Sequence, residues 1–396
     1  MPSKRLVVCT PAETPAPSRL PKGEFVERPW ISGGERLLHH LAFAAAATGQ
    51  EVELRGWLDR PLVDELAAAA GVAVTVPGED RVPTSEDVVV TPEGHDDPMH
   101  YLRAWLSEAQ LVLMVMAPIG LFGWPFLSEW QRRSPLEVTV EEVNRPESYR
   151  AIAAMGIPIW ADSAVITELA RSEGARASTV GSGQPMPFPE PPGEKAVDVA
   201  WLENNRWAPR ARELMSELDC TVDAIGVVDH DEMLAQLGAA RVLVYPGGLE
   251  GEPTITREAR ALGVVPVVLK GNPLCQHLSE EDGVLAVERL EEIPSAIEAV
   301  LADGARLATL AACGVESARA EVAWDPFVAR VAEALDELPD HDPATGARAA
   351  MGARLVEFGA EAQEHIAELD AEILRAHALG ARELAIAQAR YDELTA

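Results

Sequence analysis

The chain has 396 residues, 47% of them hydrophobic, which is enough for two cored domains and too apolar for general disorder. Acidic residues outnumber basic ones by 64 to 33, so the formal net charge is −31 at pH 7. Nucleic acids and anionic membranes bind basic surfaces. The sequence contains no basic run, so we expect neither as a partner.

Cysteine spacing and apolar runs predict a cytoplasmic protein that needs no metal. No two cysteines form a CxxC pair, and the histidines form no metal-ligand cluster with them. The apolar stretch near the N-terminus is too short for a signal peptide. The longest apolar run, residues 111–124, is broken by Pro118 and is too short to span a bilayer, so we expect no membrane segment.

In the first half of the chain, short apolar runs alternate with helical patterns. The helices are expected within 32–49, where Ser32 can cap the start and Gly49 the end, and at 62–71. Strands are expected at 5–10, 51–57, 87–94, 111–118 and 157–163. Such alternation is typical of a parallel sheet covered by helices, so we assign residues 1–185 to an α/β domain.

Five prolines within residues 184–195 interrupt this pattern, and we interpret 186–196 as a semi-rigid linker. The alternation then resumes, which assigns residues 197–338 to a second α/β domain. We expect its strands at 197–202, 221–226, 241–246 and 264–269, with helices at 208–218, 229–240 and 254–262.

Residues 347–396 contain no proline and are rich in Ala, Glu and Arg, so we expect a C-terminal helical extension. Its apolar residues follow a short 4-3-4-3 spacing. Such a helix docks on the body of the protein, forms a homodimer through a coiled coil, or serves as a tail that binds a partner.

The stretch YPGGLEGEPTITREARALGVVPVV, residues 245–268, carries the main functional signal. It predicts a strand, a loop, a helix and a strand, and ligands of open α/β sheets bind beyond the carboxyl ends of the strands. The helix start offers unpaired N–H donors at Gly251, Thr254 and Ile255 for a phosphate. Glu250 and Glu258 are suited to accept hydrogen bonds from sugar or ribose hydroxyls. Together these features predict a nucleotide-sugar site.

This stretch resembles the donor-site segment of retaining family 4 glycosyltransferases of the GT-B fold, which is marked by the pattern E-x7-E. Glu250 and Glu258 match the two ends of that pattern. The resemblance extends over 226–246 and 271–338, and in the first half over 31–54 and 162–183.

The resemblance implies two Rossmann-like domains that face each other across a cleft, with a last helix at 325–338 that crosses back to the first domain. It implies transfer of a sugar from a nucleoside-diphosphate sugar to an acceptor, with retention and usually without a metal. Glu258 would then hold the ribose, Glu250 the donor sugar, and the three amides the diphosphate. Gly33 and Gly34 would form a loop that approaches the donor from the first domain.

The residues expected to bind the diphosphate depart from the family pattern. A Gly-Arg and a following Lys-Gly are usual after the first strand of the second domain, whereas this chain has WLENNRWAPRAR at 201–212. Arg206 and Arg210 are the candidates for this role. His95 follows an expected strand and is either an acid–base or orienting group or a surface residue beside Asp96.

Two other functions remain compatible with the sequence. A nucleotide-sugar epimerase would need the same nucleotide-binding residues but would bind no acceptor. A non-catalytic scaffold could act through residues 347–396, and the missing Lys-Gly favours it, whereas the intact glutamate pair opposes it. The loop 11–31, with Phe25 and Trp30, is a candidate for the acceptor pocket together with residues 122–126.

Overall fold

The structure is a computed structural model of the chain. It describes residues 5–10, 18–19, 25–26, 33–56, 58, 60–77, 83–92, 109–116, 146–154, 156–202, 208–226, 228–246, 253–270 and 277–340.

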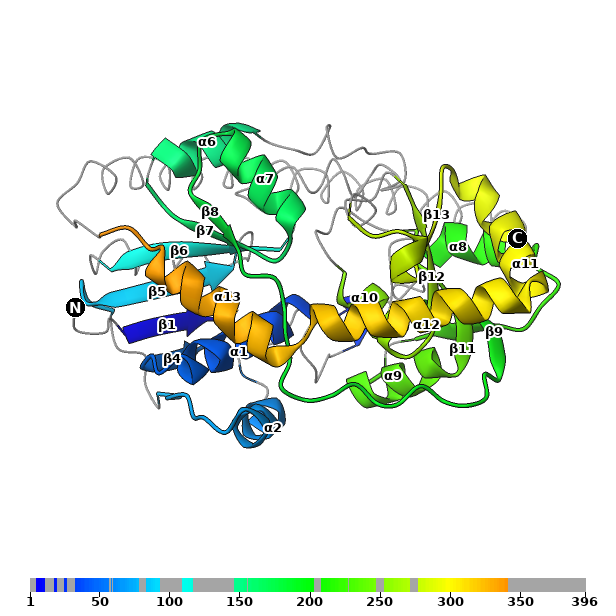
Figure 1. The fold of residues 1–396 in the computed structure, drawn as a ribbon, viewed down its shortest axis with the longest axis horizontal. Coiled ribbons are helices and arrows are strands. Elements are labelled where there is room, and N and C mark those ends of the chain that lie inside the picture. Colours follow the sequence, from blue (N-terminus) through cyan, green and yellow to red (C-terminus); the bar gives the residue numbers. More distant parts are fainter. Residues whose placement is uncertain are drawn as a thin grey trace, which may run out of the picture.

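The N-terminal domain contains a six-stranded parallel sheet in the order β4-β1-β5-β6-β7-β8 (Figure 1). Apolar clusters on its two faces involve α1 and α2 on one side and α6 and α7 on the other. The strands are β1 (Arg5–Cys9), β4 (Val52–Arg55), β5 (Asp87–Pro92), β6 (Gln110–Val115), β7 (Ile159–Ala161) and β8 (Ala177–Thr179). The helices are α1 (Gly33–Ala47), α2 (Arg60–Ala70), α6 (Pro146–Ala154) and α7 (Ala164–Ser172).

The C-terminal domain has a five-stranded parallel sheet in the order β10-β9-β11-β12-β13. Its core strands are buried, and helices again lie on both faces. The strands are β9 (Val197–Leu202), β10 (Val222–Ile225), β11 (Ala240–Val244), β12 (Val265–Leu269) and β13 (Leu285–Val287). The helices are α8 (Ala208–Met215), α9 (His230–Gly238), α10 (Thr254–Ala261), α11 (Ile293–Ala302), α12 (Gly304–Glu321) and α13 (Trp324–Asp336).

The expected alternation of strands and helices is confirmed, with one parallel sheet in each of two α/β domains. Gly49 and Gly263 follow α1 and α10 with φ of 88° and 66°, a left-handed conformation that favours glycine and ends a helix. Two short strands, β2 (Ser18–Arg19) and β3 (Phe25–Val26), pair within the long loop after β1. Trp30, residues 122–126 and the expected helical extension at 347–396 lie outside the described residues.

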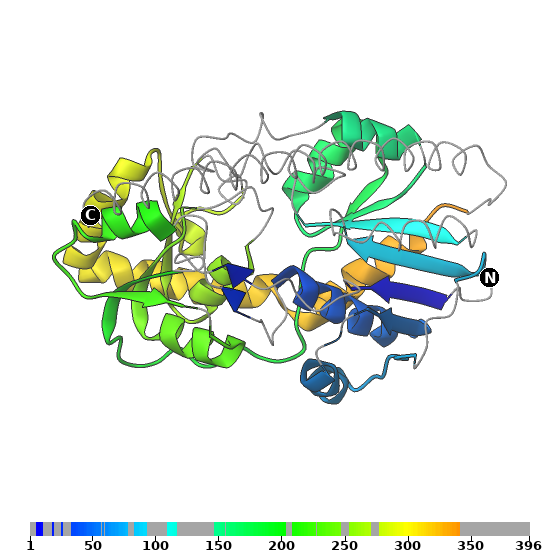
Figure 2. The same cartoon turned by 180° about the vertical axis from the view of Figure 1, so that it is seen from behind.

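The two domains are joined by helices as well as by the linker. In Figures 1 and 2, α12 and α13 form a long bent run that leaves the C-terminal domain and ends against the N-terminal one. Phe327, Val331 and Ala334 of α13 are buried in the apolar cluster that also contains α1. Where the run bends, the backbone N–H of Gln184 donates to the carbonyl of Val322 at 3.1 Å. The last helix therefore completes the core of the first domain.

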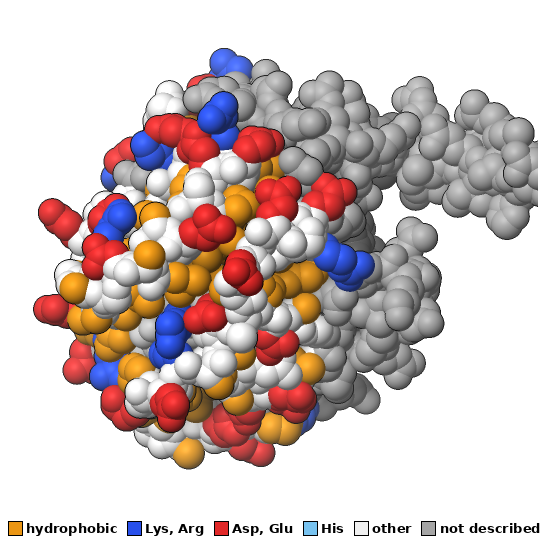
Figure 3. Space-filling view, turned by 90° about the vertical axis from the view of Figure 1, so that its right-hand side faces the viewer, with side chains coloured by type: hydrophobic (Ala, Val, Ile, Leu, Met, Phe, Trp, Pro, Cys, Tyr) orange, Lys and Arg blue, Asp and Glu red, His pale blue; other side chains and the backbone are white. Residues whose placement is uncertain are grey.

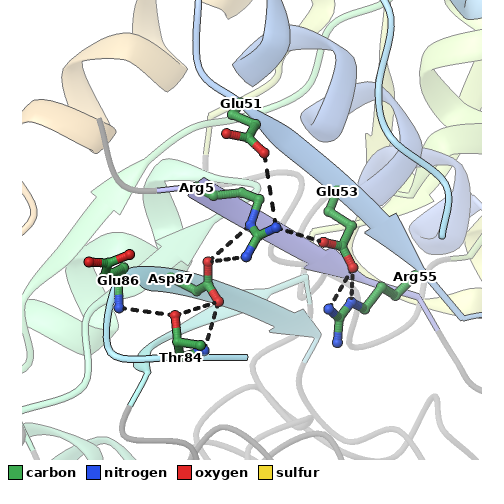
Figure 4. A network of polar contacts seen from close by, with 7 residues as sticks. All are labelled: Arg5, Glu51, Glu53, Arg55, Thr84, Glu86 and Asp87. Carbon is green, nitrogen blue, oxygen red and sulfur yellow. Dashed lines mark hydrogen bonds and ion pairs between the residues drawn. The ribbon is translucent and has the colours of Figure 1, made fainter. Parts of the chain in front are cut away.

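A network of charged side chains links β1, β4 and β5 in the N-terminal domain, and Glu53, Arg55 and Asp87 in it are buried (Figure 4). Arg5 Nη2 donates to Asp87 Oδ1 at 2.8 Å, and Arg55 Nε donates to Glu53 Oε1 at 2.6 Å. Arg5 and Asp87 are the first residues of their strands, so this pair lies at the amino edge of the sheet. Ligands of such sheets bind at the opposite edge, and we assign the Arg5–Asp87 pair a structural role.

Charged side chains are scattered over the outer end of the C-terminal domain. Figure 3 looks onto its outer end and shows acidic side chains scattered with basic ones between them. Exposed ion pairs such as Arg306–Glu280, at 2.7 Å, contribute about 0–1 kcal/mol each. Among the described residues, no helix is both long and apolar enough to cross a membrane.

The close approach of Gly183 to α13 predicts a sharp effect of one added methyl group. A Cβ at Gly183 would overlap the Cβ of Phe327 and lie 2.7 Å from its Cδ1. Gly183→Ala should therefore lower the free energy of unfolding by about 1–3 kcal/mol, the usual cost of overpacking. Thermal or denaturant unfolding measures this change.

Gly193→Ala, in the linker that follows, is the matched control, because no atom of the described residues lies within 4 Å of the position that its added methyl group would take. Equal stability of the two variants would contradict the tight packing of Gly183 on Phe327.

Candidate functional site

The candidate site lies at the carboxyl edge of the C-terminal sheet, where α10 begins. Strands β11 and β12 are parallel neighbours, and α10 connects them. Pro253 stands before the helix with φ −63° and ψ 121°, and no side chain of the described residues caps the helix start. The side chain of Thr256 is turned back, with Oγ1 donating to the Pro253 carbonyl at 2.8 Å. An uncapped helix start with free amides is suited to bind an anion.

Glu258 lies one turn into α10 and is buried, with 4% of its surface exposed. Its Oε1 atom is 2.7 Å from Nε2 of His230, the first residue of α9. An ionised carboxylate only accepts hydrogen bonds, so Nε2 carries the hydrogen and donates it. The pair joins the starts of two helices at the same edge of the sheet.

Two arginines of α10 hold the helix against α12. Arg257 Nε donates to Oε1 of Glu321 at 2.7 Å, and Arg260 Nη2 donates to its Oε2 at 2.6 Å. Arg260 is fully buried, and its Nη1 also donates to Oγ of Ser317 at 3.2 Å. Buried guanidinium groups require such partners, so these contacts fix the position of the helix that carries Glu258.

The N-terminal domain meets this region through α1, which contacts α10. Gly34 is in the first turn of α1, where an added Cβ would lie 3.1 Å from Sδ of Met116, just after β6. Farther along, Nδ1 of His40 donates to the carbonyl of Gly183 at 2.9 Å. Helix α1 therefore contacts both the segment that leads to the linker and the helix that bears Glu258.

Burial above all, together with charge repulsion from Arg36, His39 and Arg257, lowers the pKa of His40 from 6.5 to about 3. The hydrogen bond to the Gly183 carbonyl acts in the opposite direction. The ring is therefore neutral at physiological pH. Nδ1 carries the hydrogen and Nε2 is left as an acceptor.

Several residues expected at the site lie on elements that the structure describes. Thr254, Ile255 and Glu258 share α10. Gly33 and Gly34, which we expected in a loop, are the first two residues of α1. The first N–H groups of a helix have no partner within that helix. These two glycines can therefore offer N–H groups to a ligand from the start of α1, and no separate loop is needed.

The remaining expected residues cannot be placed in the site. Glu250, Gly251, Arg206 and His95 lie outside the described residues. Arg210 belongs to α8, but its side chain also lies outside them. In the described part of the chain, no group of three or more His, Cys, Asp or Glu side chains is arranged to hold a metal ion.

Two contributing residues were missed in the sequence. His230 follows β10 at the carboxyl edge of the expected sheet, and this placement was a usable signal for it. Glu321 is 63 residues from Glu258 at the far end of another helix. Only the packing of α12 on α10 brings it to the arginines.

Comparison with known proteins defines the fold. No protein-family model matches the chain, and no curated protein sequence matches it. Among solved structures, sucrose-phosphate synthase from Thermosynechococcus elongatus is 15% identical with a TM-score of 0.56. That match covers 85% of this chain and 99% of the other.

Two further structures agree. Anabaena HepE in complex with UDP-glucose is 12% identical with a TM-score of 0.54, covering 84% of this chain and 100% of that one. A glycosyltransferase from Rickettsia africae is 10% identical with a TM-score of 0.53, covering 85% and 99%. With the two parallel sheets described above, these matches show that the chain has the two-domain α/β GT-B fold.

The pKa of His40 predicts a pH-dependent stability. The unfolded chain binds a proton near pH 6.5, whereas the folded chain resists it down to about pH 3. The stabilisation is thus complete above pH 6.5 and is lost as the pH falls towards 3. At pH 5 the loss amounts to about 2 kcal/mol. Denaturant unfolding from pH 7.5 to 4.5 measures it.

His40→Asn is the informative variant, because its amide can still donate to Gly183 but cannot be protonated. Its stability should fall less steeply below pH 6.5 than that of the wild type. Parallel curves would contradict the assignment to His40.

Proposed function

We propose that the chain is a retaining glycosyltransferase that moves a sugar from a nucleoside-diphosphate sugar to an acceptor hydroxyl. The observation that carries this proposal is Glu258, a buried carboxylate on a helix whose uncapped start lies at the carboxyl edge of the sheet. HepE, which has a similar fold, has been solved with UDP-glucose and with UDP and glucose. Those complexes support a nucleotide-sugar donor here.

In this proposal the described residues bind different parts of the donor. Glu258 accepts hydrogen bonds from the ribose hydroxyls, and the amides of Thr254 and Ile255 bind the diphosphate. Gly33 and Gly34 allow the start of α1 to approach the donor from the other domain. From the sequence alone we add Gly251 to the diphosphate site, with Arg206 and Arg210 as its cations.

The proposed reaction breaks the bond between the sugar C1 and the diphosphate oxygen and forms one between C1 and the acceptor oxygen on the same face. The acceptor proton passes to the departing phosphate oxygen, so no protein nucleophile is needed. The protein binds both substrates and stabilises the charge that develops on the diphosphate. We assign Glu250 to the donor sugar and His95 to acceptor orientation or proton transfer.

A thermal-shift panel of UDP, GDP, ADP and TDP and their common sugars, with and without magnesium, tests the donor assignment. Stabilisation by one base series supports the proposal and identifies the nucleotide. No stabilisation of a folded sample by any of them would refute it. Incubation with the donor alone then separates the transferase from an epimerase, which would convert the donor without an acceptor.

Glu258→Ala should weaken binding of the nucleoside diphosphate by about 2–3 kcal/mol, because the charge-assisted hydrogen bonds from its ribose to the carboxylate are lost. Isothermal titration measures this loss. Glu298→Ala is the matched control, because Glu298 is an exposed acid on α11. Unchanged affinity in Glu258→Ala would refute the ribose site and favour a scaffold.

Glu250→Ala should depress turnover more than nucleotide affinity, because the proposed contact is to the group being transferred. Steady-state kinetics measure the turnover, and titration with the nucleoside diphosphate measures the nucleotide affinity. Equal losses in turnover and in affinity would assign Glu250 to the nucleotide instead.

A further inference from the structure

We propose that His230 is a positioning residue that orients Glu258 and thereby sets recognition of the ribose hydroxyls. The inference rests on the proposed function, because it takes Glu258 as the ribose-binding group. It adds a residue from a different helix to that site, and it makes a separate prediction about which part of the nucleotide depends on it.

The hydrogen bond engages only one oxygen of the carboxylate. His230 Nε2 donates to Oε1 at 2.7 Å, whereas Oε2 receives no hydrogen bond from the described residues. A carboxylate held at one oxygen has its plane fixed, and its other oxygen stays available as an acceptor. This division leaves Oε2 for the ligand.

Both ends of the hydrogen bond are anchored by their own helices. His230 begins α9, whose preceding residue Asp229 caps the helix by accepting from the Glu232 N–H at 2.8 Å. Glu258 lies between Arg257 and Arg260, which both bind Glu321. Helices α9 and α10 are in contact. The distance between the imidazole and the carboxylate is therefore set by the fold.

The two side chains differ in exposure in the way that a positioning role requires. The Glu258 side chain is 6% exposed, and the His230 side chain is 26% exposed. A buried carboxylate that loses its partner turns towards water, because an unpaired buried charge is costly. Loss of His230 would then misdirect Oε2 and weaken hydroxyl recognition, while the amides at the start of α10 would still bind the diphosphate.

Ribose discrimination tests the proposal directly. The probes are the nucleoside diphosphate that stabilises the wild type in the panel and its 2′,3′-dideoxy counterpart, titrated into each folded variant. In the wild type, loss of both hydroxyls should weaken binding about tenfold to a hundredfold. In His230→Ala the ratio should fall to about threefold or less, with dideoxy binding changed by no more than about twofold.

Two variants complete the design. His230→Gln retains a side-chain N–H and should recover most of the discrimination that alanine loses. Gln236→Ala, on the same helix, should behave as the wild type, because its amide bonds Glu232 and not the site. The melting temperature of each variant shows that it is folded.

The outcomes separate the inference from the function on which it rests. If the wild type binds no nucleoside diphosphate, both the proposed function and the role of His230 are overturned. A wild type that binds and discriminates, with His230→Ala discriminating equally well, overturns only the role of His230. Equal weakening of both probes would mean that the ring merely supports the local fold, and it would overturn the proposal too.

Discussion

The position of the candidate site depends on one carboxylate, that of Glu321, which binds Arg257 and Arg260 together. Helix α10 has only eight residues, and a helix of that length is not stable by itself in water. Tertiary contacts must therefore hold it. A fully buried guanidinium without a partner costs several kcal/mol, so the ion pair with Glu321 makes one placement of α10 much more favourable than others.

The same stretch of chain ties the two domains together. Glu321 is the last residue of α12, Val322 accepts from Gln184 just before the linker, and α13 then enters the core of the N-terminal domain. Residues 321–324 thus connect the ion pair that anchors the helix bearing Glu258 to the start of α13.

Sequence patterns predicted most of the fold because most elements follow local rules. The apolar run RLVVC forms a buried strand, and TITREARA followed by a glycine forms α10. Contacts between distant segments follow no local rule. The apolar residues of α13 fit the core of either domain by pattern alone, and the sequence does not reveal that Glu321 meets Arg260.

The candidate site could be predicted only in part, for the same reason. Glu258 could be identified because its function depends on a local unit of strand, loop and helix, whereas His230 acts from another helix, 28 residues away.

A net charge of −31 conflicts at first sight with the proposed binding of a diphosphate, and the local arrangement resolves the conflict. Exposed charges are screened beyond roughly 8–10 Å at physiological salt, so most of the acidic surface acts weakly on a buried site. Arg257 and Arg260 carry two positive charges, and Glu321 and Glu258 carry one negative charge each, so these four side chains together carry no net charge. Within the described residues, the proposed attraction for a diphosphate thus comes from the backbone amides and the helix dipole at the start of α10, which act only at short range.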